Sequence, residues 1–508
     1  MDATIAALLR TGPDTAPAIL AAGRPPLAYR ALRAQVARTG ATLRALGIGP
    51  ADRVAIILPN GPELATAFLS SASYAAAAPL NPALSSQDLE FCLRDFGVRA
   101  LVLHEGDAGA ARAVAERLGL SVFNVRVPAG ADAGCFELDT GAAPPRPADA
   151  DGVQPPGPDA VALILHTSGT TARPKIVPLQ QRHLAASARH IREALRLSAD
   201  DRCLNVMPLF HIHGLVACLL APLSAGGSVF CSAGFNALRF AADLEAADAT
   251  WYSAVPTMHQ TILARANRQR EKLRAGRLRF VRSSSASLPP TVLHELESLF
   301  GVPVVEAYGM TEAAHQMACN PLPPDARKPG TVGTAAGPDV AIMDERGRLL
   351  PAGSIGEIVI RGPNVFGGYE NRPEANASSF TNGWFRTGDQ GVIDEGGYVT
   401  ITGRLKEIIN RGGEKISPRE IDEVLLEHEA VRQAVAFPVP HPALGETVGA
   451  AVVLHEGATA TERDLITFVA GRLTAFKVPA TIRILDDLPR GATGKVRRLD
   501  MAQLLGLA

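Results

Sequence analysis

The stretch HTSGTTARPK at residues 166–175 places hydroxyl side chains, a glycine and two cationic residues in one short segment. Hydroxyls, backbone N–H groups beside a glycine and a lysine ammonium are all donors that phosphate oxygens accept. A Walker loop has a glycine directly before its lysine and a Ser or Thr directly after it. Here Pro174 precedes Lys175 and Ile176 follows it. The segment predicts a phosphate loop of another type, with a plain polar turn as the alternative.

The elements that position this loop follow an alternating pattern. Buried strands are predicted at 53–59, 99–104 and 120–127, helical spacing is found at 62–76, and the apolar run AVALILH leads straight into the loop. Strands that alternate with helices indicate an α/β domain with a largely parallel sheet.

After the loop the same pattern resumes at 203–214, 278–290 and 302–312. Residues 142–158 are rich in proline and predict an exposed connector. Short alternating segments separated by glycines follow over 330–402, which favours an antiparallel, β-barrel-like subdomain.

Length and composition narrow the class of protein. A chain of 508 residues predicts two to four domains, and a formal net charge of −1 argues against nucleic-acid binding. The 6 cysteines are scattered without a C-x-x-C pair, which indicates reduced thiols in the cytoplasm. We find no secretory signal, no apolar run of about 20 residues and no peroxisomal or ER-retention tail. The expected partners are small molecules, without nucleic acid or membrane, and a monomer and a homodimer both stay open.

Four more motifs follow the loop in order along the chain. They are YGMTE at 308–312, WFRTGDQG at 384–391, GRLKEIINRGGEKISP at 403–418 and LPRGATGKVRR at 488–498. Together with the loop they resemble the adenylate-forming superfamily, which includes acyl-CoA synthetases, adenylation domains and luciferases. Because the matches are ordered and cover most of the chain, the protein is identified as a member of this superfamily.

The resemblance implies an α/β fold with an α+β C-terminal part. We place a large N-terminal AMP-binding domain of stacked α/β sheets at 1–402, which includes the β-rich subdomain at 330–402. A hinge is expected at 403–406, where strand-like alternation gives way to a charged turn flanked by glycine. A small mobile α/β domain is expected at 407–508.

The reaction that the resemblance implies has two halves and uses ATP, CoA and Mg²⁺. A carboxylate attacks the α-phosphate of ATP, which gives an acyl-adenylate and pyrophosphate, and the CoA thiol then displaces AMP. The resemblance assigns the β- and γ-phosphates to Thr167, Ser168, Gly169, Thr170, Thr171 and Lys175. It assigns the nucleotide to Ser285, Ala286, Glu306, Ala307, Tyr308, Asp389 and Arg404. Among these, Tyr308 is expected against adenine, and Asp389 and Arg404 are expected at the ribose.

The catalytic set that the resemblance implies is Lys495, Thr311, Glu312 and His211. Glu312 is the expected ligand of Mg²⁺, a hard oxygen for a hard ion. Thr311 is expected at the α-phosphate; capping a helix that begins at TEAAHQM is the alternative. Lys495 is expected between the attacking carboxylate and the α-phosphate.

A swing of the C-terminal domain about Lys406 is expected to withdraw Lys495. The same swing is expected to bring Gly412 and Gly413 to the site, where glycines let the pantetheine of CoA pass close to the backbone.

The acid is expected to be very small and polar. SSSASL at 283–288 stands where many members of the superfamily read SGAAPL. An alkyl chain would leave the added hydroxyl unpaired, at a cost of about 1–3 kcal/mol. PLFHIHG and TEAAHQM add histidines, and the combination most resembles the oxalate-specific branch. The expected acid-binding residues are Ser284, Ser285, His213 and His315.

Alternatives stay open at this point. Malonate is the main rival acid, and Arg282 is a candidate for its distal carboxylate, although we expect this side chain to point away from the pocket. The histidines also allow a metal site. Ile176 replaces a frequent glycine, so the mobility of the phosphate loop is open. An enzyme that makes only the adenylate, or one that emits light, is the alternative class.

Overall fold

A computed structural model describes residues 3–107, 109–141, 154–167, 174–266, 273–274, 276–490 and 496–508. Most of the expected connector at 142–158 and four residues assigned to the phosphate loop (Ser168, Gly169, Thr170 and Thr171) lie outside the described residues, as does Lys495. The chain divides into two compact units. Of the described residues, the first unit takes those up to Thr167, within Lys175–Val340 and within Ile360–Phe380, and the second takes Pro174 and those within Ala341–Val359 and Thr381–Ala508.

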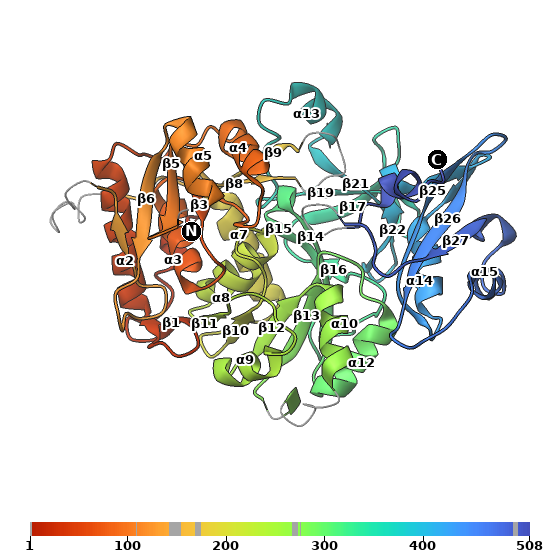
Figure 1. The fold of residues 1–508 in the computed structure, drawn as a ribbon, viewed down its shortest axis with the longest axis horizontal. Coiled ribbons are helices and arrows are strands. Elements are labelled where there is room, and N and C mark those ends of the chain that lie inside the picture. The colour runs from red at the N-terminus through yellow and green to blue at the C-terminus, as the bar shows by residue number, and fades with distance from the viewer. Residues whose placement is uncertain are drawn as a thin grey trace. The chain divides into compact units, whose positions relative to one another are not determined.

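A seven-stranded sheet in the first unit contains β8 and β9, the strands that flank the predicted phosphate loop in the sequence (Figure 1). Its order is β7 (Glu137–Asp139), β6 (Ser121–Arg126), β5 (Ala100–His104), β3 (Arg53–Ile57), β4 (Ala76–Pro79), β8 (Val161–His166) and β9 (Ile176–Gln180). β3, β4, β5 and β6 pair in parallel, whereas β8 and β9 are antiparallel. The predicted strands at 53–59, 99–104 and 120–127 are confirmed. The apolar runs of β3 and β5 suit strands buried on both faces, whereas β6 buries only Phe123 and Val125, two residues of one face.

A nine-stranded sheet in the same unit carries the acid-site segments. Its order is β16 (Thr334–Ala335), β15 (His315–Cys319), β14 (Val304–Met310), β13 (Phe280–Ser284), β12 (Trp251–Ala254), β10 (Arg202–Asn205), β11 (Ser228–Cys231), β1 (Pro17–Leu20) and β2 (Leu27–Ala28). β10, β12, β13 and β14 are parallel neighbours, so their carboxyl ends meet at one edge. Side chains of α9 (Phe240–Ala247), α10 (Pro256–Arg265) and α12 (Pro290–Phe300) bury one face of these strands.

The other helices of this unit are α1 (Ile5–Leu8), α2 (Tyr29–Ala45), α3 (Pro62–Tyr74), α4 (Ser86–Asp95), α5 (Ala110–Leu118), α7 (Gln181–Ala194), the π-helix η1 (His213–Leu220), α8 (Ala221–Ser224), the 3₁₀ turn η3 (Thr311–Ala313) and α13 (Pro373–Ser379). α3 confirms the helical spacing predicted for 62–76 and is buried on nearly every side. No helix in the described ranges is both long enough and apolar enough to cross a membrane.

Two further sheets complete the fold. The first, with order β18 (Leu349–Leu350), β17 (Asp339–Met343), β19 (Gly356–Arg361), β21 (Trp384–Ile393) and β20 (Phe380–Thr381), also pairs β22 (Val399–Arg404) with β21. The second has the order β24 (Glu414–Ile416), β23 (Ile409–Arg411), β26 (Gly445–Leu454) and β25 (Val431–His441), with β27 (Thr481–Ile484) beside β26. The short η4 (Leu405–Glu407), η5 (Ala475–Lys477) and η6 (Arg498–Asp500), and helices α14 (Pro418–Leu426), α15 (Glu462–Ala470) and α16 (Met501–Leu504), accompany this last sheet.

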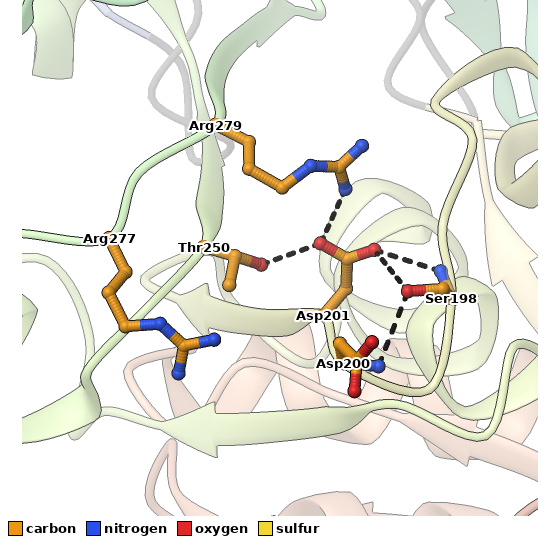
Figure 2. Close-up of a pocket in the computed structure, with 6 residues that line it drawn as sticks. All are labelled: Ser198, Asp200, Asp201, Thr250, Arg277 and Arg279. Atoms are coloured by element: carbon orange, nitrogen blue, oxygen red, sulfur yellow. Dashed lines mark hydrogen bonds and ion pairs between the residues drawn. The ribbon is translucent and has the colours of Figure 1, made fainter.

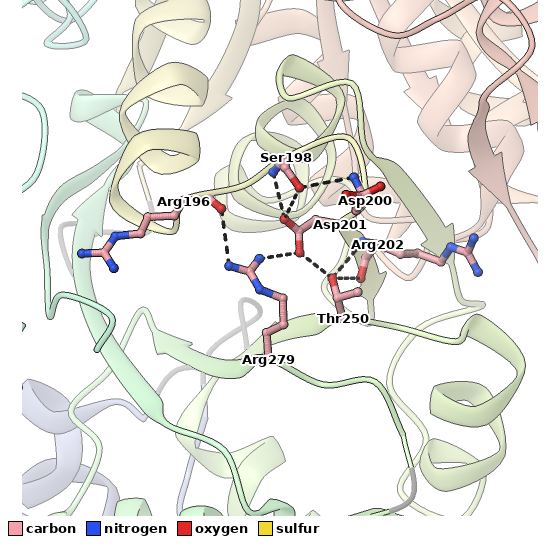
Figure 3. Close-up of polar contacts among 7 residues, drawn as sticks. All are labelled: Arg196, Ser198, Asp200, Asp201, Arg202, Thr250 and Arg279. Carbon is pink, nitrogen blue, oxygen red and sulfur yellow. Dashed lines mark hydrogen bonds and ion pairs between the residues drawn. The ribbon is translucent and has the colours of Figure 1, made fainter. Parts of the chain in front are cut away.

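The amino ends of β10, β12 and β13 are tied together by Asp201 (Figures 2 and 3). Its carboxylate accepts hydrogen bonds from the Ser198 backbone N–H at 2.8 Å, Thr250 Oγ1 at 2.8 Å and Arg279 Nη1 at 2.5 Å. The pocket in Figure 2 lies at this edge of the sheet. Ligands of such sheets bind beyond the carboxyl ends of the strands, so we assign this network to stability.

Asp201→Asn is expected to lower the free energy of unfolding by about 2–4 kcal/mol, because it removes the charge that a buried network is built around. Chemical denaturation measures this loss. Asp200→Asn is the matched control: its side chain is exposed, so it should change stability by less than about 0.5 kcal/mol. Equal stabilities of the two variants would contradict the assignment.

Candidate active site

The two ends of the predicted phosphate loop are joined by hydrogen bonds. Thr167 N donates to Lys175 O at 2.9 Å, and Lys175 N donates to Thr167 Oγ1 at 3.1 Å. They extend the antiparallel pairing of β8 with β9, whose last pair is His166 with Ile176. These bonds bring Thr167 and Lys175, the two described residues assigned to the phosphates, next to each other at the end of a buried strand.

A tyrosine links the predicted phosphate lysine to the predicted magnesium ligand. Lys175 Nζ lies 3.8 Å from the centre of the Tyr369 ring, and Tyr369 Oη donates a hydrogen bond of 2.8 Å to Glu312 Oε1. The Glu312 side chain is buried, and Phe366 N donates to the Glu312 backbone carbonyl at 2.9 Å. The structure thus brings Lys175 and Glu312 to the two ends of one side chain.

Sequence reasoning missed Tyr369. Its only signal is an aromatic residue after two glycines in FGGYENRP. The Tyr369 ring contacts the Lys175 ammonium, and the Tyr369 hydroxyl orients the Glu312 carboxylate.

The surroundings of Glu312 suit Mg²⁺ and do not form a cage of protein ligands. Among the described residues, no group of three His, Cys, Asp or Glu side chains could hold a metal. Mg²⁺ is usually bound by one or two carboxylates together with substrate phosphates and water. An oriented carboxylate beside a phosphate-type lysine fits that pattern, and bound Mg²⁺ would supply counter-charge to the phosphates.

The alternative role of Thr311 as the cap of a long helix is wrong. The chain makes one 3₁₀ turn at Thr311–Ala313 and then returns as β15, antiparallel to β14. Ala314 and His315 take positive φ values of 48° and 99°. A Cβ on Gly309 would lie 1.8 Å from the carbonyl oxygen of His315, so the return requires glycine there. Pairing with β14 overrides the helical spacing of this segment.

Three of the predicted acid-binding residues meet in one cluster. His213 Nδ1 lies 3.1 Å from Ser285 Oγ, and the rings of His213 and His315 stack with centres 4.9 Å apart. His213 is the first residue of the π-helix η1, a rare conformation that is frequent at functional sites. Ser285 follows β13 with a φ of 74° and is exposed, while both histidines are buried.

The hydroxyl group of the fourth predicted residue, Ser284, forms a hydrogen bond within the nine-stranded sheet. Its fully buried hydroxyl donates to the backbone carbonyl of Ala307 on β14 at 2.9 Å. The hydroxyl proton of Ser284 is therefore committed to the backbone.

The remaining assigned residues of this unit lie near these segments. Glu306 and Tyr308 are buried on the same face of β14, and Gly330 N donates to Glu306 Oε2 at 3.2 Å. Ala286 is exposed directly after Ser285, and His211 is partly buried with its ring centre 4.9 Å from that of Phe210.

Arg282 does not point away from the predicted acid-binding histidines, so the sequence expectation for its orientation is wrong. Its fully buried guanidinium donates to His315 Nε2 at 3.1 Å, to Ser253 Oγ at 3.1 Å and to His213 Nε2 at 3.4 Å. Val281, the preceding residue, packs into the helical core on the other face of β13. Strand alternation therefore turns Arg282 toward the histidines.

Both histidines are held neutral. Burial, and next the charge of Arg282, keeps the pKa of His213 and of His315 well below the ordinary value. Arg282 only donates, so the Nε2 atom that it reaches on each ring must accept. Each ring then carries its proton on Nδ1. A cation against both Nε2 atoms also disfavours the metal-site alternative.

The second unit brings the two predicted ribose residues together. Asp389 of β21 and Arg404 of β22 are partners in the antiparallel ladder, and Arg404 Nε donates to Asp389 Oδ1 at 2.7 Å. The Asp389 side chain is buried, and its backbone N–H donates to Thr387 Oγ1 at 3.1 Å. Gly388 between them has a φ of 75°. Thr387 and the left-handed Gly388 thus fix the backbone of Asp389 within β21.

The predicted hinge and CoA segments lie in the same unit. Lys406 lies within η4, which follows β22 directly, and Gly412 and Gly413 form the turn between β23 and β24 with φ values of 60° and 99°. A two-residue turn of this kind already requires left-handed residues, so the glycines have a local reason to be present. Their contact with CoA stays a prediction, as do the hinge and the domain bounds around it.

The fold and the positions of these motifs define an adenylate-forming enzyme. Residues 9–370 match the AMP-binding enzyme family, and residues 420–495 match the C-terminal domain of the AMP-binding enzymes. The chain therefore belongs to the AMP-binding enzyme family. This confirms the superfamily inferred from the motifs, and the α/β fold with a large N-terminal and a smaller C-terminal domain is confirmed by solved structures.

Known proteins resemble the chain over nearly its whole length. The probable CoA ligase CCL9 of Humulus lupulus is 46% identical over 490 residues, which cover 96% of this chain and 93% of that protein. The oxalate–CoA ligase of Arabidopsis thaliana is 46% identical over 468 residues, which cover 90% of this chain and 89% of that protein. ATP-bound MatB from Rhodopseudomonas palustris superimposes with a TM-score of 0.87 at 32% identity and covers 99% of this chain and 98% of its own. The chain is an AMP-forming acid–CoA ligase that uses ATP, CoA and Mg²⁺.

Proposed function

We propose that this ligase activates a very small acid with two carboxylates, and that oxalate is its preferred substrate. The observation that carries the proposal is the cluster of His213, His315 and Ser285 with the buried Arg282 behind it. The similarity to the oxalate–CoA ligase of Arabidopsis thaliana supports the same acid.

The chemistry of the cluster fits a second carboxylate. One carboxylate of oxalate must attack the α-phosphate, so the other needs hydrogen-bond donors at short reach. Neutral His315 carries a proton on Nδ1, and exposed Ser285 has a hydroxyl that accepts from His213 and can donate to a ligand. Polar groups of this kind reject an alkyl chain, which would leave them unpaired at a cost of about 1–3 kcal/mol each.

The other assigned residues complete the proposal for both half-reactions. Thr167 and Lys175 hold the pyrophosphate that leaves, and Glu312 binds Mg²⁺ with the support of Tyr369. Asp389 and Arg404 bind the ribose. Because the acid and ATP are both anionic, positioning and counter-charge supply most of the rate enhancement.

An acid panel tests the proposal. With fixed ATP and CoA, the release of AMP and the loss of free thiol are followed for oxalate, malonate, acetate and a long-chain fatty acid. We expect oxalate to give the highest kcat/KM, with AMP release and thiol loss in equal amounts. A higher kcat/KM for malonate than for oxalate would show that malonate is the preferred acid. AMP release without thiol loss would show an enzyme that only makes the adenylate.

Lys406→Pro is expected to separate the two half-reactions. A fixed φ at the hinge should leave acid-dependent ATP–pyrophosphate exchange within about 3-fold of wild type and slow thioester formation about 10-fold or more. Lys406→Ala is the control, since alanine removes the charge and keeps the backbone free to rotate. Equal losses in both half-reactions for the proline variant would contradict a hinge at this residue.

A further inference from the structure

Arg282 is a buried cation without a carboxylate partner. Its side chain is 0% exposed, and the fourth contact of its guanidinium is a 3.3 Å hydrogen bond to Gln316 Oε1. No ion pair of Arg282 with an Asp or Glu is found in the described part of the chain. Its Nε also has no hydrogen-bond partner there. Every group that the guanidinium contacts is therefore neutral.

The titratable groups around Arg282 do not neutralise it. The thiols of Cys319, Cys218 and Cys203 are those whose charge would act on it most strongly. Burial raises the pKa of Cys203 and of Cys319, so both stay protonated. Taking an unpaired charge out of water is costly unless an opposite charge compensates for it. A bound anion would supply the negative charge that the described residues do not provide.

Hydrogen bonds connect this cation to the exposed end of the acid site. Arg282 donates to Ser253 Oγ, and Ser253 Oγ lies 2.7 Å from His213 Nε2, which accepts its proton. His213 then donates from Nδ1 to Ser285 Oγ, so the Ser285 proton is available to a ligand. The second connection is direct, from Arg282 to His315 Nε2. In both series of hydrogen bonds the positive charge of Arg282 polarises each following donor. This strengthens the last donor of each series, the Ser285 hydroxyl in one and His315 Nδ1 in the other.

We propose that Arg282 is a positioning and specificity-determining residue whose unpaired charge, acting through His213, Ser285 and His315, selects an acid with two negative charges. The inference rests on the proposed function, because it takes the bound acid to be the missing counter-charge. A purely structural role for Arg282, which would only hold the two rings in place, makes a different prediction. Such a role would affect all acids of the same size equally.

Oxalate and oxamate separate these two roles. Oxamate has the size and shape of oxalate, but a neutral amide replaces one carboxylate. The quantity measured is the inhibition constant of oxamate against oxalate, divided by the KM of oxalate. We expect this ratio to fall about 10-fold or more in Arg282→Gln, the scale of one unit charge acting at a partly buried site. The KM of ATP should stay near its wild-type value.

Two further variants test the role of Arg282 independently if Arg282→Gln does not fold. Gln316→Glu keeps Arg282 and places a carboxylate where Gln316 Oε1 now accepts from Nη2, so the charge is neutralised with little change in volume. We expect the same fall in the ratio. Arg282→Lys keeps the charge and loses the forked geometry, so the KM of oxalate should rise while the ratio stays within about 3-fold of wild type.

The outcomes distinguish this inference from the proposed function. Wild-type enzyme that does not use oxalate would contradict the proposed function, and the same ratio is then measured with the preferred acid and its monoamide. Wild-type enzyme that prefers oxalate, with an unchanged ratio in Gln316→Glu or in folded Arg282→Gln, would overturn the role of Arg282. A fall of equal size in Arg282→Lys would also overturn it, because the charge is still present.

Discussion

Lys495→Ala is expected to slow adenylate formation about 10²-fold or more, the scale for one preorganised donor that stabilises developing charge. In the first half-reaction a carboxylate approaches a polyphosphate, and both are anions. A lysine between the attacking oxygen and the α-phosphate lowers this repulsion most in the transition state. ATP–pyrophosphate exchange that depends on the acid measures the loss. The assignment of Lys495 rests on the motif LPRGATGKVRR, since the residue lies outside the described ones.

Lys477→Ala is the matched control for this variant. Lys477 lies in the same unit and pairs with Glu420 at 2.7 Å, and a partly exposed ion pair of this kind contributes about 1 kcal/mol or less to stability. Its exchange rate should therefore stay near wild type. An exchange rate in Lys495→Ala equal to that of Lys477→Ala would remove Lys495 from the catalytic set.

Arg498, three residues after Lys495 in the sequence, forms two ion pairs that bear on the predicted hinge. Arg498 Nε pairs with Glu407 at 3.0 Å, and Arg498 Nη2 pairs with Asp422 at 2.6 Å. The segment that follows the lysine loop is thereby fixed to the residue directly after the predicted hinge at Lys406. A rotation of the backbone at the hinge would move this segment together with Glu407.

Much of the fold could be predicted because its signals are local. β3 and β5 are buried apolar runs, and α3 has helical spacing along its whole length. Patterns of this kind can be recognised in the sequence without knowledge of the tertiary contacts.

The geometry of the proposed acid site could be predicted only in part, because it depends on distant segments. Sequence motifs proposed His213, His315 and Ser285, and the structure brings these three side chains together. They did not show which face of β13 Arg282 occupies, since that is decided by packing of the neighbouring Val281 against α9, α10 and α12. The alternative of a helix after Thr311 is wrong for the same reason. Its spacing suits a helix, but pairing with β14 makes it a strand.

Glu312→Gln is expected to lower the rate of adenylate formation about 10²-fold or more at ordinary magnesium concentration, because a neutral amide binds a divalent cation far less well than a carboxylate. The amide oxygen can still accept from Tyr369 Oη, so the fold around the site should persist. ATP–pyrophosphate exchange at increasing Mg²⁺ measures the effect, and the half-saturating Mg²⁺ concentration should rise.

Two neighbouring variants make this test specific for the metal. Glu370→Gln is the control: Glu370 follows Tyr369 directly and pairs with Arg53 at 2.7 Å, so its loss should affect stability and leave the Mg²⁺ dependence unchanged. Tyr369→Phe removes only the hydrogen bond to the Glu312 carboxylate, worth about 1.5–3 kcal/mol. We expect an effect between those of the other two variants, because a carboxylate that has lost its orientation still carries its charge.

The order of these three effects decides what Glu312 does. If Glu312 binds Mg²⁺, the half-saturating concentration should rise most in Glu312→Gln, less in Tyr369→Phe and not at all in Glu370→Gln. If Glu312 only anchors Tyr369 beneath Lys175, Tyr369→Phe should be at least as damaging as Glu312→Gln, because glutamine keeps that anchor and phenylalanine breaks it. A Mg²⁺ dependence that is equal in all three variants would place the metal on another residue.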